Sequence, residues 1–217
     1  QIVFTGSVPT GVAIATAAAA NVVPCVLELG GKSAAIVHSD ADLAACENDV
    51  RWGIYFNAGQ VCSAMSRVIA HDSIHDALVD RIAGVARSLT VLPGIDQPEF
   101  GPTMGSMVSH AQRDRAAGMV ADAAAAGAEI VTGGHPLNNP GAFLEPTVLT
   151  GVTPDMTIAQ EEVFGPVLSV LRFTDDAEAI RIANGTPYGL VGGVFTRSLD
   201  RATSAARQKR AGPGFVN

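Results

Sequence analysis

The sequence predicts an α/β fold with a largely parallel sheet, and three observations support this class. Short runs rich in Val, Ile and Phe alternate with longer segments of helical periodicity, which is the pattern of βα units. The 217 residues are 47% hydrophobic, so the chain can bury a sizeable core. No internal repeat or low-complexity linker interrupts the alternation. We therefore expect an ordered, compact chain.

The first part of the chain predicts a strand, a turn and a helix, then two extended segments and a second helix. In order, these cover residues 2–5, 6–11, 12–20, 26–29, 34–37 and 40–55. The first helix ends near Asn21 and Pro24, because proline cannot continue a helix. Ser39 or Asp40 is the expected N-cap of the second helix. An irregular segment, residues 56–62, follows.

The remaining chain continues the alternation of strands and helices. Strands are predicted at residues 67–70, 130–132, 163–173 and 190–195, and helices at residues 74–88, 106–126, 177–183 and 199–210. Loops containing Gly and Pro separate these elements at residues 93–102 and 133–141. The sequence starts within one strand-like run and stops within another, so we expect a fragment of a longer protein.

Charge and cysteine content favour a small soluble ligand. The formal net charge is -7 with acidic and basic residues interspersed, so nothing in the charge pattern suggests binding to a nucleic acid or a membrane. The cysteines at 25, 46 and 62 are odd in number and lack CxxC spacing, which indicates neither a disulfide framework nor a structural zinc site. Such usage is typical of a reducing, cytoplasmic location. The apolar stretch at residues 12–26 is too short and too interrupted to span a bilayer.

One turn, Gly6-Ser-Val-Pro-Thr-Gly11, is placed to approach a nucleotide. It follows a predicted strand and precedes a helix, whose N-terminus attracts pyrophosphate. It departs from both common fingerprints, because Val8 stands where the dinucleotide motif has its second Gly and Val12 stands where a P-loop has Lys. An ordinary βα turn is the alternative interpretation.

Two further patterns fail as ligand sites. Gly30-Gly-Lys-Ser33 resembles the end of a P-loop, but Val26 occupies the position of its first glycine. His71 and His75 have the i, i+4 spacing of two metal ligands on a helix. No third ligand follows at a recognisable spacing, so we expect no metal.

Cys62 and Glu28 are the candidates for covalent chemistry. Cys62 lies in a short loop after a Gly-Gln pair, where a thiol can be exposed and approached by backbone N–H groups; a small buried hydrophobe is the alternative. Glu28 stands between Leu27 and Leu29 in a run that predicts a buried strand, where desolvation would raise its pKa. A cysteine nucleophile and such a carboxylate are the two groups needed to form and hydrolyse a thioester.

Four motifs occur in the order and approximate spacing of a known family. They are Phe4-Thr-Gly-Ser7, Leu27-Glu-Leu-Gly-Gly-Lys-Ser33, Phe56-Asn-Ala-Gly-Gln-Val-Cys62 and Glu161-Glu-Val-Phe-Gly-Pro166. With Pro187-Tyr-Gly-Leu190 and the terminal Phe-Val-Asn217, the chain resembles the NAD(P)-dependent aldehyde dehydrogenase superfamily over essentially its whole length. The resemblance implies that residues 1–29 are the C-terminal piece of a Rossmann-like NAD(P)-binding domain. Residues 30–217 would then be a parallel-sheet catalytic domain, truncated at its C-terminal end.

The resemblance also implies roles for individual residues. Cys62 would attack the aldehyde carbonyl and its backbone N–H would form one half of the oxyanion hole, while Glu28 would activate the water that hydrolyses the thioester. The implied cofactor-binding residues are Gly6, Ser7 and Gly11 on the pyrophosphate side, Leu29 beside the nicotinamide, and Glu162 and Phe164 at its ribose and ring.

The implied activity is oxidation of an aldehyde to a carboxylic acid with NAD or NADP, in a homodimer or homotetramer. A coenzyme A-acylating enzyme is an alternative, although such relatives commonly lack the glutamate. A non-catalytic or truncated family member, serving as a structural or interaction module, is another. A cysteine hydrolase would need a suitably placed His to activate Cys62. The family's upstream Asn and ribose-binding positions lie before residue 1, so we expect the 217 residues alone to be inactive.

Overall fold

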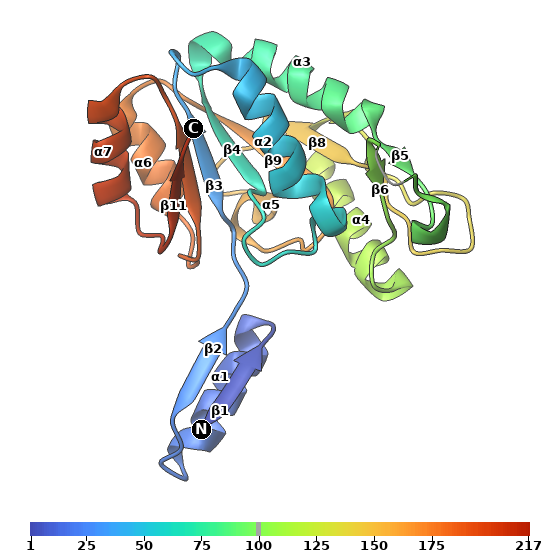
Figure 1. The fold of residues 1–217 in the computed structure, drawn as a ribbon, viewed down its shortest axis with the longest axis vertical. Helices are drawn as coiled ribbons and strands as arrows, with labels where there is room; N and C mark the ends of the chain where they lie inside the picture. Colours follow the sequence, from blue (N-terminus) through green and yellow to red (C-terminus); the bar gives the residue numbers. More distant parts are fainter. Residues whose placement is uncertain (99–100) are drawn as a thin grey trace.

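The computed structural model describes residues 1–98 and 101–217 and consists of two unequal parts. A small N-terminal unit contains two strands and one helix, and a larger α/β unit contains the remaining elements (Figure 1). The segment between β2 and β3 joins them, and each unit has its own sheet. The predicted α/β class with parallel sheets is confirmed.

The N-terminal unit is a βαβ piece formed by β1 (Ile2–Thr5), α1 (Val8–Ala19) and β2 (Cys25–Glu28). The two strands pair in parallel along their full length. The prediction of a turn up to residue 11 is wrong, since α1 begins at Val8. Pro9 explains the early start, because a proline in the first turn lacks an N–H that would have no partner there and already has a helical φ.

The larger unit is built on a seven-stranded sheet of order β11-β10-β3-β4-β9-β8-β7. All neighbouring strands are parallel except β7 and β8. The strands are β3 (Ala34–Val37), β4 (Arg67–His71), β7 (Glu129–Thr132), β8 (Thr147–Thr150), β9 (Val167–Phe173), β10 (Gly192–Phe195) and β11 (Gly214–Val216). The central strands are almost fully buried, which accounts for their continuous apolar runs.

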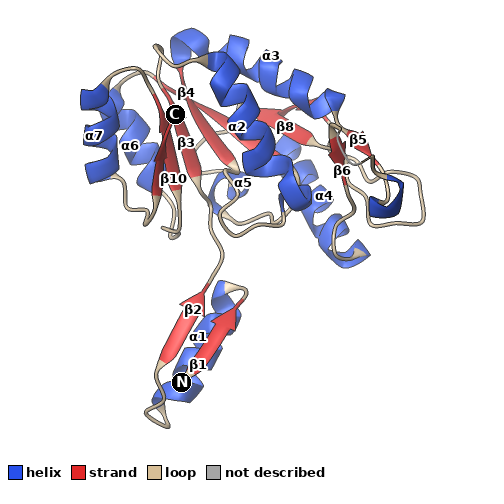
Figure 2. Cartoon of the chain, viewed as in Figure 1, coloured by secondary structure: helices blue, strands red, loops and turns tan. Residues whose placement is uncertain are grey.

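Helices cover both faces of this sheet (Figure 2). They are α2 (Leu43–Tyr55), α3 (Asp72–Ser88), α4 (His110–Ala125), α5 (Thr157–Gln160), α6 (Asp176–Asn184) and α7 (Leu199–Gln208). Right-handed crossovers place α2 and α3 on one face and α6 and α7 on the other, because the chain moves in opposite directions along the sheet in the two cases. A separate parallel pair, β5 (Thr90–Val91) and β6 (Thr103–Met104), lies beyond α3.

Several predicted boundaries shift for identifiable reasons. Helix α2 is capped by Asp42, whose carboxylate accepts from the N–H groups of Ala44 and Ala45 at 3.0 and 3.3 Å. The predicted cap Asp40 instead accepts from Thr196 Oγ1 at 2.8 Å. Strands β5 and β6 and helix α5 were not predicted, because each is too short to show a period. Strand β8 was not predicted either, because Val148 and Leu149 are its only aliphatic residues. Of the predicted loop at residues 93–102, residues 99–100 lie outside the described residues.

The first residues of helix α4 and strand β9 also differ from the sequence-based prediction. Helix α4 begins at His110, where the Ser109 hydroxyl caps it by accepting from the Gln112 N–H at 3.2 Å, and not at residue 106. Strand β9 begins at Val167 and not at residue 163. The left-handed backbone of Phe164, with φ of 54°, and the following Gly-Pro pair prevent an earlier start.

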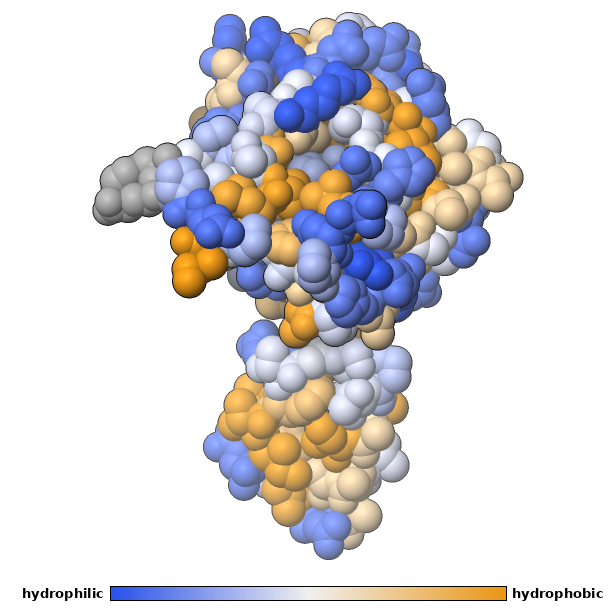
Figure 3. Space-filling model, turned by 90° about the vertical axis from the view of Figure 1, so that its right-hand side faces the viewer, coloured by the Kyte–Doolittle hydropathy of each residue, from blue (hydrophilic) through white to orange (hydrophobic). Residues whose placement is uncertain are grey.

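The surface of the N-terminal unit is unusually apolar (Figure 3). Val3, Val12 and Val26 are exposed on its strands and helix. A two-stranded sheet with such side chains in water has little stability of its own, so these faces call for a covering neighbour.

In the part of the chain that the structure describes, no helix is long and apolar enough to cross a membrane.

Candidate active site

Both units contribute to one cavity of about 730 Å³. Of the residues predicted to form the site, all but Gly11 line it: Gly6, Ser7, Glu28, Leu29, Cys62, Glu162 and Phe164. Gly11 is buried within α1, where a Cβ would lie 2.5 Å from Leu29 Cδ2. Its glycine therefore allows the helix to approach Leu29 closely, and it does not face the cavity.

Cys62 follows a loop with an uncommon backbone. Asn57, Ala58 and Gly59 have φ values of 51°, 52° and 71°, all in the left-handed region. The Asn57 and Gln60 amides each donate to the other's backbone carbonyl, at 3.0 and 3.2 Å. These contacts fix the turn that leads to Cys62, whose free thiol is half-buried at the cavity wall.

Gly59 is where this loop meets the segment before β9. A Cβ on Gly59 would lie 2.1 Å from the Gly165 carbonyl oxygen, and its φ of 71° disfavours any side chain. We expect Gly59→Ala to lower the free energy of unfolding by at least about 2 kcal/mol, measured by chemical denaturation. Gly84→Ala is the control, because Gly84 lies within α3 with open space around it and the change should stabilise by about 0.5–1 kcal/mol. Equal effects of the two changes would contradict this account.

Glu28 differs from its sequence-based expectation. It ends β2 beside the cavity, but its side chain is exposed, so the prediction of a buried carboxylate is wrong for this chain. Among the described residues, β2 pairs with β1 alone, so the other edge of β2 is uncovered. The argument from burial therefore does not apply to Glu28 in this structure.

The Gly30-Gly31 pair lies where the segment after Glu28 contacts the Cys62 loop and Glu162. A Cβ on Gly31 would lie 2.5 Å from the Cys62 carbonyl oxygen, so only glycine permits this passage of the backbone. The Gly31 N–H donates to Glu162 Oε1 at 3.0 Å, and a Cβ on Gly30 would meet Glu162 Oε2 at 2.2 Å. Burial raises the pKa of the Glu162 carboxyl, and the hydrogen bond from Gly31 opposes the shift. The segment following Glu28 is thus held against both the cysteine loop and Glu162.

Comparison with known proteins identifies the chain. A profile described as the aldehyde dehydrogenase family matches residues 1–217, the whole sequence. The chain belongs to the aldehyde dehydrogenase family. The resemblance seen in the four sequence motifs is therefore confirmed.

Individual members of the aldehyde dehydrogenase family align over nearly the whole chain. The chain is 42% identical to a mitochondrial aldehyde dehydrogenase of Leishmania tarentolae and 41% identical to a betaine aldehyde dehydrogenase of Sinorhizobium fredii. Both alignments cover 100% of this chain, and they cover 43% and 45% of those proteins, respectively. A crystal structure of an NAD-dependent aldehyde dehydrogenase from Sinorhizobium meliloti superposes with a TM-score of 0.91 at 39% identity, over 99% of this chain and 42% of that one. A betaine aldehyde dehydrogenase from Staphylococcus aureus in complex with NAD+ gives 0.93 at 36% identity, over 99% and 43%. The chain thus spans less than half the length of these relatives.

The aldehyde dehydrogenase cavity also contains residues to which the sequence analysis assigned no role. Gln60, Gln112, Arg115 and Tyr188 all line it. Gln60 Oε1 accepts from the Val108 N–H at 2.9 Å, which ties the cysteine loop to the segment before α4. Gln60 and Tyr188 stand within the family motifs, whereas Gln112 and Arg115 belong to a helix whose sequence shows no motif. The fold brings Gln112 and Arg115 to the site.

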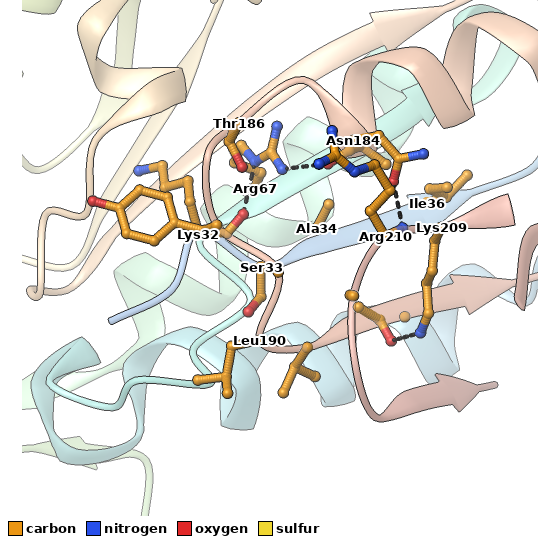
Figure 4. Close-up of a pocket in the computed structure, with 17 residues that line it drawn as sticks. Lys32, Ser33, Ala34, Ile36, Arg67, Asn184, Thr186, Leu190, Lys209 and Arg210 are labelled. Atoms are coloured by element: carbon orange, nitrogen blue, oxygen red, sulfur yellow. Dashed lines mark hydrogen bonds between the residues drawn. The ribbon is translucent and has the colours of Figure 1, made fainter. Parts of the chain in front are cut away.

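A second, smaller cavity of about 20 Å³ is lined by Lys32, Ser33 and residues of β3, by Arg67 and by the segment that leads into β10 (Figure 4). Arg67 crosses it, donating to the carbonyls of Lys32, Ile182 and Ala183 at 3.0, 2.9 and 2.8 Å. Burial lowers the pKa of the Arg67 guanidinium to about 10. Burial and the nearby Arg67 charge lower the pKa of Lys32 to about 7. Arg67 thereby joins the beginning of β3 to the end of α6 and supports the wall behind the site.

His71 and His75 are separated by their local contacts. His71 Nδ1 accepts from the Ser73 N–H at 3.2 Å and caps α3. The buried His75 ring contacts Asp76 and Thr150. Among the described residues, no three His, Cys, Asp or Glu side chains gather as metal ligands.

Proposed function

We propose that the protein containing this chain oxidises an aldehyde to a carboxylic acid with NAD+ or NADP+. Cys62 is the nucleophile and Glu28 the general base. The supporting observation is that both residues line one cavity together with Gly6, Ser7 and Glu162. The two groups lie on different structural units, and the tight passage of Gly31 past Cys62 brings the units together there.

The residues of the cavity fit a dinucleotide. Ser7, Val8 and Pro9 line it, so the N-terminus of α1 faces the cavity. The Ser7 hydroxyl pairs with Thr10 Oγ1 at 2.9 Å and does not cap the helix, which leaves first-turn N–H groups for a phosphate oxygen. Glu162 offers a carboxylate to ribose hydroxyls and Phe164 an apolar surface to the nicotinamide ring. The relatives from S. meliloti and S. aureus, described as NAD-dependent and bound to NAD+, favour NAD.

The chemistry begins at the half-buried thiol. The Cys62 thiol first loses its proton to water in the cavity. The resulting thiolate attacks the aldehyde carbon, and the oxygen takes the electron pair of the C=O bond while the Cys62 backbone N–H donates to it. The bound dinucleotide supplies the acceptor for the hydride that leaves this carbon. Re-formation of the C=O bond then leaves a thioester on Cys62.

Glu28 completes the reaction. Its carboxylate takes a proton from water, the resulting hydroxide attacks the thioester carbon, and the thiolate of Cys62 leaves as the acid is released. Its place on the wall of the cavity suits this role, since a water molecule held in the cavity can reach the carboxylate. Base catalysis of this kind is worth about 10²–10⁴-fold in rate.

The presence of Glu28 in the cavity favours hydrolysis over transfer of the acyl group to coenzyme A. We expect the natural full-length protein to form NADH and free acid at the same rate with or without coenzyme A, measured by absorbance at the NADH band and by product chromatography. An acyl-coenzyme A product would instead support the acylating alternative. Formation of no NADH with any aldehyde would support a structural or interaction module. The cytoplasmic location and the homodimer or homotetramer stay predictions.

A further inference from the structure

Two side chains of α4, Gln112 and Arg115, hold the segment that carries Glu162 and Phe164. They are one helical turn apart and therefore share a face of α4. The Arg115 guanidinium donates to the Glu162 carbonyl through both terminal nitrogens and to the Val163 carbonyl through one, each at 3.1 Å. Gln112 Nε2 donates to the carbonyls of Val163 and Phe164 at 2.9 and 3.0 Å. Three successive carbonyls are thus bound by one helix face.

The segment depends on these hydrogen bonds from α4 because its own backbone forms few stabilising contacts. It lies between α5 and β9, outside any helix or strand. Phe164 has a φ of 54°, a region that costs an aromatic residue free energy. Among the described residues, no backbone N–H donates to the carbonyls of residues 162–164. The side chains of α4 therefore satisfy these acceptors.

The other side of the segment is attached to Gly31, which itself passes close to the cysteine loop. Glu162 Oε1 accepts from the Gly31 N–H at 3.0 Å, and Gly31 passes the Cys62 carbonyl too closely for a Cβ. Glu162 is therefore held between α4 and the nucleophile loop. Loss of the α4 contacts would release the backbone of residues 162–164. The turn before Cys62 would keep its own hydrogen bonds between Asn57 and Gln60.

We propose that Gln112 and Arg115 are positioning residues for hydride transfer. By fixing the carbonyls of residues 162–164, they set the place at which Glu162 and Phe164 meet the nicotinamide half of the dinucleotide. This inference rests on the proposed function. Neither side chain forms or breaks a bond: the hydride passes from the substrate carbon to the dinucleotide, and the thioester stays on Cys62. Ester hydrolysis at Cys62 needs no hydride acceptor and is independent of this segment.

The test compares Arg115→Met and Gln112→Met with Arg113→Met in the natural full-length protein. Arg113 is on the same helix but bonds to Asp114 and Gly141, away from the segment. We expect each of the first two changes to lower kcat/KM for aldehyde oxidation by about 10-fold and to weaken NAD+ binding in calorimetry. The primary isotope effect with a 1-deuterated aldehyde should rise. Hydrolysis of p-nitrophenyl acetate should stay within about 2-fold, and Arg113→Met should match the wild type in all assays.

A double-mutant cycle with Glu162→Ala separates positioning from direct contact with the dinucleotide. If Arg115 acts through the segment, Arg115→Met adds little to Glu162→Ala; fully additive losses overturn the proposal. Unchanged oxidation and NAD+ affinity in both Met variants overturn it as well, as does an equal loss of ester hydrolysis. Any of these outcomes overturns the role of Gln112 and Arg115 but leaves the proposed function standing, provided that Cys62→Ala is inactive. If the wild type oxidises no aldehyde, the proposed function and this inference are both overturned.

Discussion

In the natural full-length protein, Cys62→Ala is expected to lose aldehyde oxidation, with kcat falling by at least about 10⁴-fold. Alanine has no electron pair to attack the aldehyde, and no thioester can form. The thiol is half-buried and makes no hydrogen bond in the described structure, so the fold should lose less than about 1 kcal/mol. NADH formation under saturating aldehyde measures the loss, and thermal unfolding checks the fold.

Cys25→Ser is the matched control for this change. Cys25 is also a half-buried free cysteine, but it lies in β2 with its thiol directed to the Val23 carbonyl at 3.9 Å. We expect its oxidation rate to stay within about 2-fold of the wild type. Aldehyde oxidation by Cys62→Ala at the wild-type rate would refute the assignment of the nucleophile.

Glu28→Gln is expected to separate the two halves of the reaction. Glutamine keeps the shape of the side chain but cannot take a proton from water, so turnover to free acid should fall by about 10²–10⁴-fold. The steps before hydrolysis do not use this base. The first turnover should therefore release NADH in a burst equal to the enzyme concentration, with the acyl group retained on Cys62 and visible as added mass in intact-protein mass spectrometry.

Glu129→Gln serves as the control, because Glu129 is an exposed carboxylate of β7 that does not line the cavity. It should show neither a burst nor a lower rate. An unchanged steady state in Glu28→Gln, with no acyl-enzyme, would mean that another group activates water. Glu161, which also lines the cavity, would then be the first to replace.

Much of the fold was predictable because its strands are short apolar runs separated by helices. The runs at β3 and β4 were found to within one residue, since these strands are buried on both faces and contain little but aliphatic side chains. The caps were less predictable. Ser39, Asp40 and Asp42 are all reasonable N-caps by type, and only the contact of Asp40 with Thr196 leaves Asp42 for the helix.

The site was predictable where its chemistry depends on residue type, and not where it depends on distant contacts. Cys62 and Glu28 stand out in sequence, but the exposure of Glu28 follows from strand pairing that the local run cannot reveal. Gln112 and Arg115 look like ordinary surface residues of an Ala-rich helix. Their partners are 47 to 52 residues away along the chain, beyond the reach of any periodicity.

The glycine pair at residues 30–31 shows how a failed motif can still be informative. Its resemblance to a P-loop is limited to Gly30-Gly-Lys-Ser33, because Val26 stands where a P-loop has its first glycine. What requires glycine there is the close passage of the Cys62 carbonyl, at a distance where a Cβ would overlap. Close approach of backbone to backbone is a common reason for glycine that a motif search does not test.

The linker between the two units also divides the residues of the site into two groups along the chain. Glu28 and the turn at residues 6–11 lie before it, whereas Cys62, Glu162 and α4 lie after it. An exchange of sequence at Gly30 would therefore replace the proposed base and the start of α1 together and leave the proposed nucleophile with its supporting loops. The glycines would still fit against Cys62 in such a hybrid. A hybrid of two family members joined there is expected to take its rate of thioester hydrolysis from the first parent and its reactivity toward aldehydes from the second.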